Sequence, residues 1–369
     1  MAIRRRTVAD MDVEPGFWRG RRVLITGHTG FKGSWLSLWL AALGAEVAGL
    51  SIDVPTEPSL FRLARLDESM EWIEADVRDY DAVRSALART RPEVVVHMAA
   101  QSLVRRSFAQ PRETYETNVM GTVNLLEAVR AQADVRVLVN VTSDKCYENR
   151  EWEWGYREDE PMGGHDPYSN SKGAAELVTS AYRRSFFSEP GDTRVASARA
   201  GNVIGGGDWA EDRLVPDLMR AALDGRPLRI RNPHAIRPWQ HVLNPLSGYL
   251  VLAQALAQEP DHARAWNFGP SDEDARPVAW IVERLAEHWP AGLSWTVDDG
   301  PRPHEAHHLK LDSSRARLRL GWRPLLDLDA ALEATVAWYR ALGEGADMRA
   351  ATLGQIETLS DRERTNAAA

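Results

Sequence analysis

From Val23 to Gly33 the chain reads Val-Leu-Ile-Thr-Gly-His-Thr-Gly-Phe-Lys-Gly, and this stretch predicts the fold. Four apolar or β-prone residues lead into three glycines spaced three apart, and an apolar run follows. This order predicts a buried strand, a tight turn and a helix. In such a unit Gly27 makes the turn, Gly30 lets a pyrophosphate approach the backbone, and Gly33 lets the helix pack on the strand. A strand-to-helix turn without a ligand could carry the same glycines, so the motif alone leaves both interpretations open.

The residues that follow alternate between strand and helix patterns. Segments between the strands have helical periodicity, as at 80–90. Strands separated by amphipathic helices predict an α/β fold with a doubly wound parallel sheet, the Rossmann arrangement. Ligands of such sheets bind beyond the carboxyl ends of the strands, so the chemistry is expected there. The further stretches that predict strands are 45–53, 70–75, 93–100, 135–141 and 194–200.

After Gly201 the elements become shorter and are interrupted by glycine and proline. One long helix is predicted at 242–257, a strand at 265–269 and a short strand at 294–297. Residues 343–369 carry Gly, Ala and charge, and the last dozen or so are expected to be frayed. The predicted division is a dinucleotide-binding domain, a smaller C-terminal α/β substrate lobe and a tail: 17–203 with 239–269, 204–238 with 270–342, and 343–369.

The composition describes a globular protein. Of 369 residues 44% are hydrophobic and 27% charged, enough for one large domain with a lobe or for two domains. The net charge is −8 with well-distributed basic residues, which argues against nucleic-acid binding as the main role. No apolar run follows the basic residues 4–6 or is long enough to span a membrane, so neither a signal peptide nor a membrane partner is expected. Cys146 is the single cysteine, which excludes an intramolecular disulfide and favours a cytoplasmic location.

Asp53 is the candidate for the adenosine ribose. It ends the second predicted strand, 20 residues after Gly33, which is about where a Rossmann unit places the residue that binds the ribose hydroxyls. A carboxylate there repels a 2′-phosphate and so favours NAD over NADP. Asp53 could instead be an ordinary loop aspartate, and Ser51 could take the ribose role.

Tyr168 and Lys172 form the strongest local motif. They lie four residues apart, so on a helix they share one face. An ammonium beside a phenol lowers the phenol pKa, and a bound NAD⁺ lowers it further, which makes the phenolate usable as a general base. Tyr-x-x-x-Lys also occurs by chance, but its place after a fifth strand and a glycine-rich opening favours the catalytic interpretation.

A second motif, Thr142-Ser143-Asp144-Lys145, ends the predicted strand 135–141. A hydroxyl at this strand end can bridge the tyrosine and a substrate oxygen. Asp144, at a buried strand end, could have a raised pKa and act as an acid. A cap or a salt bridge to Lys145 would explain the aspartate equally well from spacing alone.

Taken together, these stretches resemble the extended short-chain dehydrogenase/reductases that act on nucleotide sugars, over roughly residues 17–340. Within that superfamily the chain is most similar to the CDP-glucose 4,6-dehydratases, because epimerases usually lack an acid at the position of Asp144. The matching stretches are 27–33, 97–101, 118–122, 142–147, 168–172, 199–209, 237–242 and 311–314.

The resemblance implies a bound NAD, a CDP-hexose substrate and a set of contacts, with no metal. The implied catalytic residues are Ser143, Asp144, Lys145, Tyr168 and Lys172. The implied cofactor contacts are Gly27, Thr29, Gly30, Phe31, Lys32, Gly33, Asp53, Asp76, Val77, Ala99, Ala100, Gln101, Asn118, Thr142, Tyr168 and Lys172. The implied substrate contacts are Gln101, Ser102, Ser143, Asn202, Arg237 and Arg302, with the two arginines as clamps for the diphosphate; Arg199 is expected to be structural.

The implied reaction begins when Tyr168 deprotonates the sugar 4-hydroxyl as C4 passes a hydride to NAD⁺. The 4-ketone acidifies H5, and Asp144 protonates the departing 6-hydroxyl. Related dTDP-glucose dehydratases carry glutamate as the C5 base where this chain has Lys145. An ammonium of ordinary pKa is a poor base at pH 7. Lys145 is therefore the C5 base only if its surroundings lower its pKa; otherwise it steadies the enolate or Asp144.

Other interpretations stay open at three points: the function, the histidine cluster and one pair of helices. A 4-epimerase would need Tyr168 and Lys172 but no acid at Asp144, and a dinucleotide-binding sensor would commonly lose the Tyr/Lys pair. The histidines at 304, 307 and 308 favour a polar rim over a metal site, since no cysteine lies near them. Helices 113–131 and 168–187 match the pair that forms a four-helix interface in homodimers or homotetramers of this superfamily, although they could simply cover the sheet.

Overall fold

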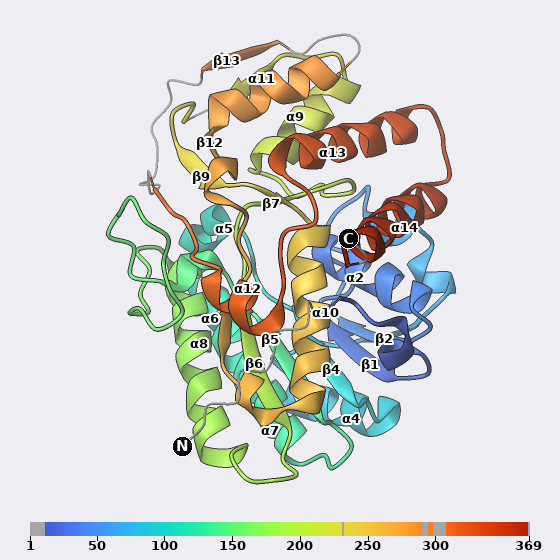
Figure 1. Cartoon of the computed structure of the whole chain (residues 1–369), viewed down its shortest axis with the longest axis vertical. Coiled ribbons are helices and arrows are strands. Elements are labelled where there is room, and N and C mark those ends of the chain that lie inside the picture. Colours follow the sequence, from blue (N-terminus) through green and yellow to red (C-terminus); the bar gives the residue numbers. More distant parts are fainter. Residues whose placement is uncertain (1–11, 231, 290–293, 298–307, 368–369) are drawn as a thin grey trace.

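A parallel sheet of seven strands forms the centre of this computed structural model, which describes residues 12–230, 232–289, 294–297 and 308–367 (Figure 1). Its strand order is β11-β6-β5-β4-β1-β2-β3, and every neighbouring pair is parallel. The strands are β1 Arg22–Thr26, β2 Glu46–Ser51, β3 Glu71–Glu74, β4 Val94–His97, β5 Val137–Val141, β6 Arg194–Arg199 and β11 Ala265–Asn267. The prediction of a doubly wound parallel sheet is therefore confirmed.

Helices cover both faces of this sheet. The central strands β4 and β5 are almost continuously apolar, β5 reading Val-Leu-Val-Asn-Val with every residue buried, as expected of strands covered on both sides. On one face α2 (Phe31–Ala42) and α10 (Leu243–Gln258) bury their apolar residues in the larger core. The opposite face is covered by α4 (Tyr80–Thr90), α7 (Gly121–Arg130) and α8 (Pro167–Phe186).

The predicted helix 113–131 is not one regular helix. It consists of α6 (Pro111–Tyr115), a π-helical turn at Glu116–Met120 and α7. Single π-helical turns are frequent at functional sites, and this one contains Asn118. A short helix, α5 (Val104–Ala109), precedes it.

A smaller lobe lies above the seven-stranded sheet in the view of Figure 1. It contains α9 (Leu214–Leu223), α11 (Val278–His288) and α13 (Leu328–Gly343). Its short strands pair as β8 (Leu228–Ile230) with β13 (Trp295–Val297) and β9 (Ile236–Pro238) with β12 (Ala275–Pro277). A third pair, β7 (Val203–Ile204) with β10 (Gln240–His241), joins the lobe to α10.

Two segments of the C-terminal part differ from the expected pattern. α12 (Ser314–Leu320), which falls within the predicted lobe, packs on α10 and β11 because Ala316 and Leu320 are buried in the main core. The end of the chain, expected to be frayed, continues as α14 (Met348–Ala367). It packs on α13, α2 and α3 (Leu60–Leu63), since apolar Met348, Ile356 and Leu359 recur at helical spacing and are buried.

Candidate active site

The glycine turn between β1 and α2 has the geometry that the sequence predicts. Gly27 has φ of +74°, and a Cβ there would lie 2.7 Å from the backbone nitrogen of Ala99. A Cβ on Gly33 would lie 2.2 Å from the carbonyl oxygen of Gly27, so only glycine lets the helix begin so close to the turn. Gly30 meets no such constraint, because its nearest contact would be an ordinary 3.4 Å. The open space in front of Gly30, at the N-terminus of α2, fits a pyrophosphate.

The side chains around this turn fall into an exposed and a buried group. Asp53 is exposed just beyond β2, and its carbonyl oxygen accepts a hydrogen bond from Thr29 Oγ1 at 2.6 Å. Asp76 is ion-paired with Arg78 at 2.6 Å. Val77 is buried, and a Cβ on Gly121 would lie 2.8 Å from its Cγ2.

Asn118 connects Gln101, which follows β4, to Ser171 on α8. Its side-chain amide accepts from the Gln101 backbone nitrogen at 2.8 Å and donates to the Gln101 carbonyl at 3.0 Å. It also donates to Ser171 Oγ at 2.8 Å. Ser171 lies on α8 between Tyr168 and Lys172, so the π-helical turn connects Gln101 to α8.

Three catalytic candidates meet at the end of β5. Asp144 is 1% exposed, and its Oδ1 accepts from Ser143 Oγ at 2.9 Å. Asp144 Oδ2 is buried with no hydrogen-bond partner in the described part of the chain, and a Cβ on Gly201 would lie 1.8 Å from it. Tyr168 lies at the start of α8, where the hydroxyl of Ser143 acts to lower its pKa. Lys145 follows in a short 3-10 helix and is half-buried.

Burial shifts the pKa values of Tyr168 and Lys172 in opposite directions, and both shifts favour the neutral side chain. It raises the pKa of Tyr168 to about 12, although the hydrogen bond from Ser143 acts in the opposite direction. It lowers the pKa of Lys172 to about 8, against the raising effect of Glu176. Lys172 Nζ donates to the carbonyl of Val141 at 3.4 Å. The phenol therefore needs additional positive charge before it can act as a base near pH 7.

Lys32 and Arg213, two basic residues near Tyr168 and Lys172, make contacts that the sequence did not predict. Lys32 was expected only as part of the cofactor turn, yet its Nζ donates to Tyr249 at 3.1 Å. Burial, with help from the charge of Lys172, lowers the pKa of Lys32 to about 7. Arg213, before α9, was not predicted at all. It donates to Ser102 at 3.2 Å and to Asp208 at 3.1 Å, and its charge acts on Tyr168.

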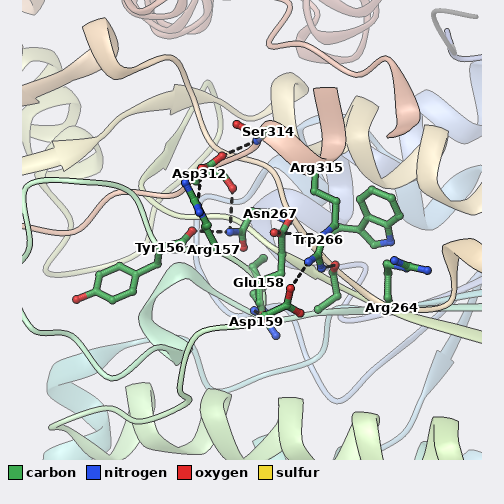
Figure 2. Close-up of polar contacts among 12 residues, drawn as sticks. Tyr156, Arg157, Glu158, Asp159, Arg264, Trp266, Asn267, Asp312, Ser314 and Arg315 are labelled. Carbon is green, nitrogen blue, oxygen red and sulfur yellow. Dashed lines mark hydrogen bonds and ion pairs between the residues drawn. The ribbon is translucent and has the colours of Figure 1, made fainter. Parts of the chain in front are cut away.

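The loop that follows Asp144 is anchored to the edge of the sheet. Asn267 on β11 donates to the carbonyls of Tyr156 and Asp312 at 2.8 and 3.1 Å (Figure 2). Its backbone nitrogen donates to Glu158, which is also ion-paired with Arg315 at 3.5 Å. These contacts hold the loop that runs from Asp144, after β5, to Tyr168 on α8.

Of the remaining predicted substrate residues, the structure describes Asn202 and Arg237. Asn202 has φ of +41° and follows β6, where its carbonyl accepts from Gln240. Arg237 lies on β9, and its guanidinium donates to the Ile236 carbonyl at 2.9 Å. Arg302 and the histidines at 304 and 307 lie outside the described residues. Among the described residues, no group of three or more His, Cys, Asp or Glu side chains could hold a metal ion.

Comparison with known proteins gives the family. The profile of the GDP-mannose 4,6 dehydratase family matches residues 24–335, so the chain belongs to that family. It is 56% identical over 341 residues to the CDP-glucose 4,6-dehydratase of Salmonella typhimurium, covering 91% of this chain and 95% of that protein. A dTDP-glucose 4,6-dehydratase of Neisseria meningitidis is 27% identical, with 86% of this chain and 93% of that protein covered.

Solved structures show the same fold. A dTDP-glucose 4,6-dehydratase from Streptomyces venezuelae with bound NAD matches with a TM-score of 0.73 and 26% identity, over 89% of this chain and 99% of that one. A UDP-glucose 4-epimerase from Thermus thermophilus in complex with NAD matches with a TM-score of 0.74 and 26% identity, over 86% and 99%.

Proposed function

We propose that this chain is an NAD-dependent CDP-glucose 4,6-dehydratase, which converts CDP-D-glucose to CDP-4-keto-6-deoxy-D-glucose and water. The observation that carries the proposal is the buried carboxyl of Asp144, which accepts a hydrogen bond from Ser143 and whose charge acts on Tyr168. A 4-epimerase needs the tyrosine and the lysine but no acid beside them. The 56% identity to a CDP-glucose 4,6-dehydratase supports the same substrate.

NAD fits the glycine turn between β1 and α2, where the backbone at Gly30 is open and the first turn of a helix faces the space. When bound, it would take the hydride from C4 and return it to C6. Asp53 is placed to accept from the adenosine ribose, and Asp76 with Val77 to border the base. The segment 99–101 and Thr142 would line the nicotinamide half, with Lys172 donating to its ribose.

Each catalytic side chain then has one task. Tyr168 takes the proton of the 4-hydroxyl, and Lys172 together with Ser143 stabilises the phenolate. Asp144 protonates the 6-hydroxyl so that it leaves as water. Lys145 removes the proton from C5, the position that the 4-ketone acidifies. The Lys145→Ala variant tests this last role, because exchange of H5 with solvent deuterium should fall while oxidation at C4 persists.

We place the substrate between the sheet and the smaller lobe. The proposed domain division therefore assigns NAD to the dinucleotide-binding domain and the nucleotide sugar to the lobe. Gln101, Ser102 and Asn202 would contact the hexose, and Arg237 with Arg302 the diphosphate. Arg213, which donates to Ser102, would add a further cation beside the hexose.

The defining experiment compares CDP-glucose, dTDP-glucose and GDP-mannose as substrates of the purified enzyme. The alkali-induced absorbance of a 4-keto sugar reports dehydration, and chromatography of the nucleotide sugar reports epimerisation. We expect the 4-keto-6-deoxy product from CDP-glucose above all. Release of a C4 epimer without a keto product would assign the epimerase activity instead.

A homodimer through α6, α7 and α8 is the proposed assembly. Large hydrophobic side chains are exposed on this side: Phe108, Tyr115, Met120, Leu177 and Phe186. Leu177, 61% exposed on α8, is the central test residue. Leu177→Asp should shift the sedimentation coefficient toward the monomer. The matched control is Leu318→Asp on α12, whose leucine is 68% exposed, and it should leave the assembly unchanged.

None of the described helices is long and apolar enough to cross a membrane. We place the enzyme in the cytoplasm, because its proposed substrate is an activated nucleotide sugar and its single thiol, Cys146, is buried. Fractionation of cells that express the chain tests this placement.

A further inference from the structure

The backbone of Gly201 packs directly on the carboxyl group of Asp144. A Cβ at position 201 would lie 1.8 Å from Asp144 Oδ2, 2.1 Å from Cγ and 2.7 Å from Oδ1. Any side chain at this position would therefore displace the carboxyl. The backbone nitrogen of Asp144 also donates to the carbonyl of the preceding residue, Ala200, at 3.4 Å. The segment 200–201, which follows β6, thus decides where the proposed acid of the reaction lies.

Gln240 on β10 holds this segment through its side-chain amide. Its Nε2 donates to the carbonyl of Gly201 at 3.3 Å and to the carbonyl of Phe268 at 2.9 Å. Gly201 follows β6 and Phe268 follows β11, so the amide joins two chain segments that leave neighbouring strands of the sheet. Gln240 is only 1% exposed, so water is not at hand to replace these two hydrogen bonds.

The glutamine is kept at this position at a cost. Its Oε1 is buried and has no hydrogen-bond partner in the described part of the chain. The opposite orientation of the amide would place Oε1 against two carbonyl oxygens, so the orientation is fixed by these partners. An unpaired buried acceptor is unfavourable. A residue that breaks the rule for polar burial is typical of a functional site, and one of the bonds gained here goes to the backbone beside Asp144.

We propose that Gln240 is a positioning residue for the proposed acid: it holds Gly201 against Asp144, so that the carboxyl keeps the orientation needed to protonate the 6-hydroxyl. This inference rests on the proposed dehydratase activity. The proton that leaves with the 6-hydroxyl as water still comes from Asp144. Gln240 acts on the reaction only through the backbone of Gly201 and the carboxyl that packs on it.

Loss of this amide should slow elimination and spare oxidation. The side-chain hydrogen bonds that the structure describes for Gln240 reach Gly201 and Phe268, and neither residue lies on α8, which carries Tyr168 and Lys172. Oxidation at C4 depends on that helix, whereas departure of the 6-hydroxyl depends on Asp144. A displacement on the order of 1 Å can remove much of the effect of a catalytic group, so a shifted carboxyl should be a poor acid.

The first experiment mixes CDP-glucose rapidly with the parent enzyme and with Gln240→Met. Absorbance of the reduced nicotinamide follows oxidation, and quenched samples measure the 4-keto-6-deoxy product. In Gln240→Met we expect oxidation within about twofold of the parent, elimination roughly tenfold slower and NADH that accumulates.

The matched control is Gln254→Met on α10. Gln254 is also 1% exposed, and its amide bonds the Asp12 carbonyl at 2.9 Å and Trp18 Nε1 at 2.9 Å. Its loss removes a buried amide away from the site, so both steps should keep the parent rates and no NADH should accumulate.

The second experiment tests whether Gln240 acts through Asp144. Adding Gln240→Met to Asp144→Asn should leave the elimination rate of Asp144→Asn unchanged within about twofold, because the acid is already absent. A further tenfold loss in the double variant would overturn the proposal. If Gln240→Met does not fold, Gly201→Ala replaces it in both experiments, since its Cβ displaces the same carboxyl.

Equal slowing of oxidation and elimination in Gln240→Met, with no accumulation of NADH, would also overturn the proposal and leave Gln240 as a purely structural residue. Parent-like elimination in Gly201→Ala would do the same, because the position of the carboxyl would then not matter. Failure of the proposed function is distinct, because the parent enzyme would make no 4-keto sugar from CDP-glucose.

Discussion

Glu176 and Arg199 form an ion pair at 2.8 Å in which each side chain is only 4% exposed. Glu176 also accepts from the hydroxyls of Thr142 and Ser197. Although burial opposes ionisation, Arg199 and these hydroxyls hold the pKa of Glu176 below its ordinary value. Glu176 lies one helical turn beyond Lys172, so this buried ion pair anchors α8 close to Lys172.

Glu176→Gln should lower the free energy of unfolding by about 3–5 kcal/mol, because it leaves Arg199 buried without its counter-charge. The matched control is Glu127→Gln on α7. Glu127 pairs with Arg130 at 2.7 Å but is 29% exposed, so its loss should change stability by less than about 1 kcal/mol. Urea denaturation of the two variants measures both effects. Equal losses would show that burial of the Glu176 pair is irrelevant to its strength.

The stability of the cofactor-free enzyme should rise with pH in alkaline solution through Lys172. Its pKa falls from 10.5 in the unfolded chain to about 8 on burial, so the unfolded chain binds more protons between these values. The cost of burying the charge is complete below the folded pKa and disappears as pH rises toward the unfolded one. Between about pH 7.5 and about pH 9.5 this effect should raise the parent's free energy of unfolding by about 2 kcal/mol. Lys172→Met should lack this rise. Urea titrations at the two pH values measure it, and parallel parent and variant curves would contradict it.

Tyr168→Phe should lower turnover by roughly 10²–10⁴-fold and leave substrate affinity within a few fold, because only the proton acceptor is removed. Steady-state kinetics with the 4-keto sugar assay measures this change. Tyr115→Phe is the control, since its hydroxyl bonds Asn170 on the outer side of the molecule. Near-normal turnover of Tyr168→Phe would remove this residue from the mechanism.

Asp144→Asn should separate oxidation from elimination. Tyr168 and Lys172 remain, so oxidation at C4 should survive, whereas an amide cannot protonate a leaving hydroxide. Enzyme-bound NADH should then accumulate after mixing with substrate, visible by stopped-flow absorbance of the reduced nicotinamide. If this variant makes the 4-keto-6-deoxy sugar at the parent rate with no NADH build-up, Asp144 is structural.

Arg237→Ala should raise KM more than it lowers kcat, since a diphosphate clamp binds ground state and transition state alike. Initial rates over a range of CDP-glucose concentrations separate the two constants. Arg226→Ala is the control, because Arg226 is an exposed arginine paired with Asp224. An unchanged KM for Arg237→Ala would place this arginine away from the substrate.

The features that could be predicted from sequence are those set by neighbours along the chain. Gly27 is required by the positive φ of the turn, and Gly33 by a steric contact within the same strand–turn–helix unit. Tyr168 and Lys172 share a helix face because four residues make about one turn. The alternation of strand and helix patterns predicted the parallel sheet, and the strand ends located Asp144.

The features that only the tertiary structure decided join residues far apart in sequence. Lys32 meets Tyr249 across 217 residues, and Arg213 reaches Ser102 across 111. The burial of α14 likewise depends on helices from both ends of the chain. No local pattern encodes such contacts, because they depend on the order of strands in the sheet and on how the lobe packs over their ends. The shifted pKa values of Tyr168, Lys172 and Lys32 follow from that packing, since burial is a property of the assembled fold.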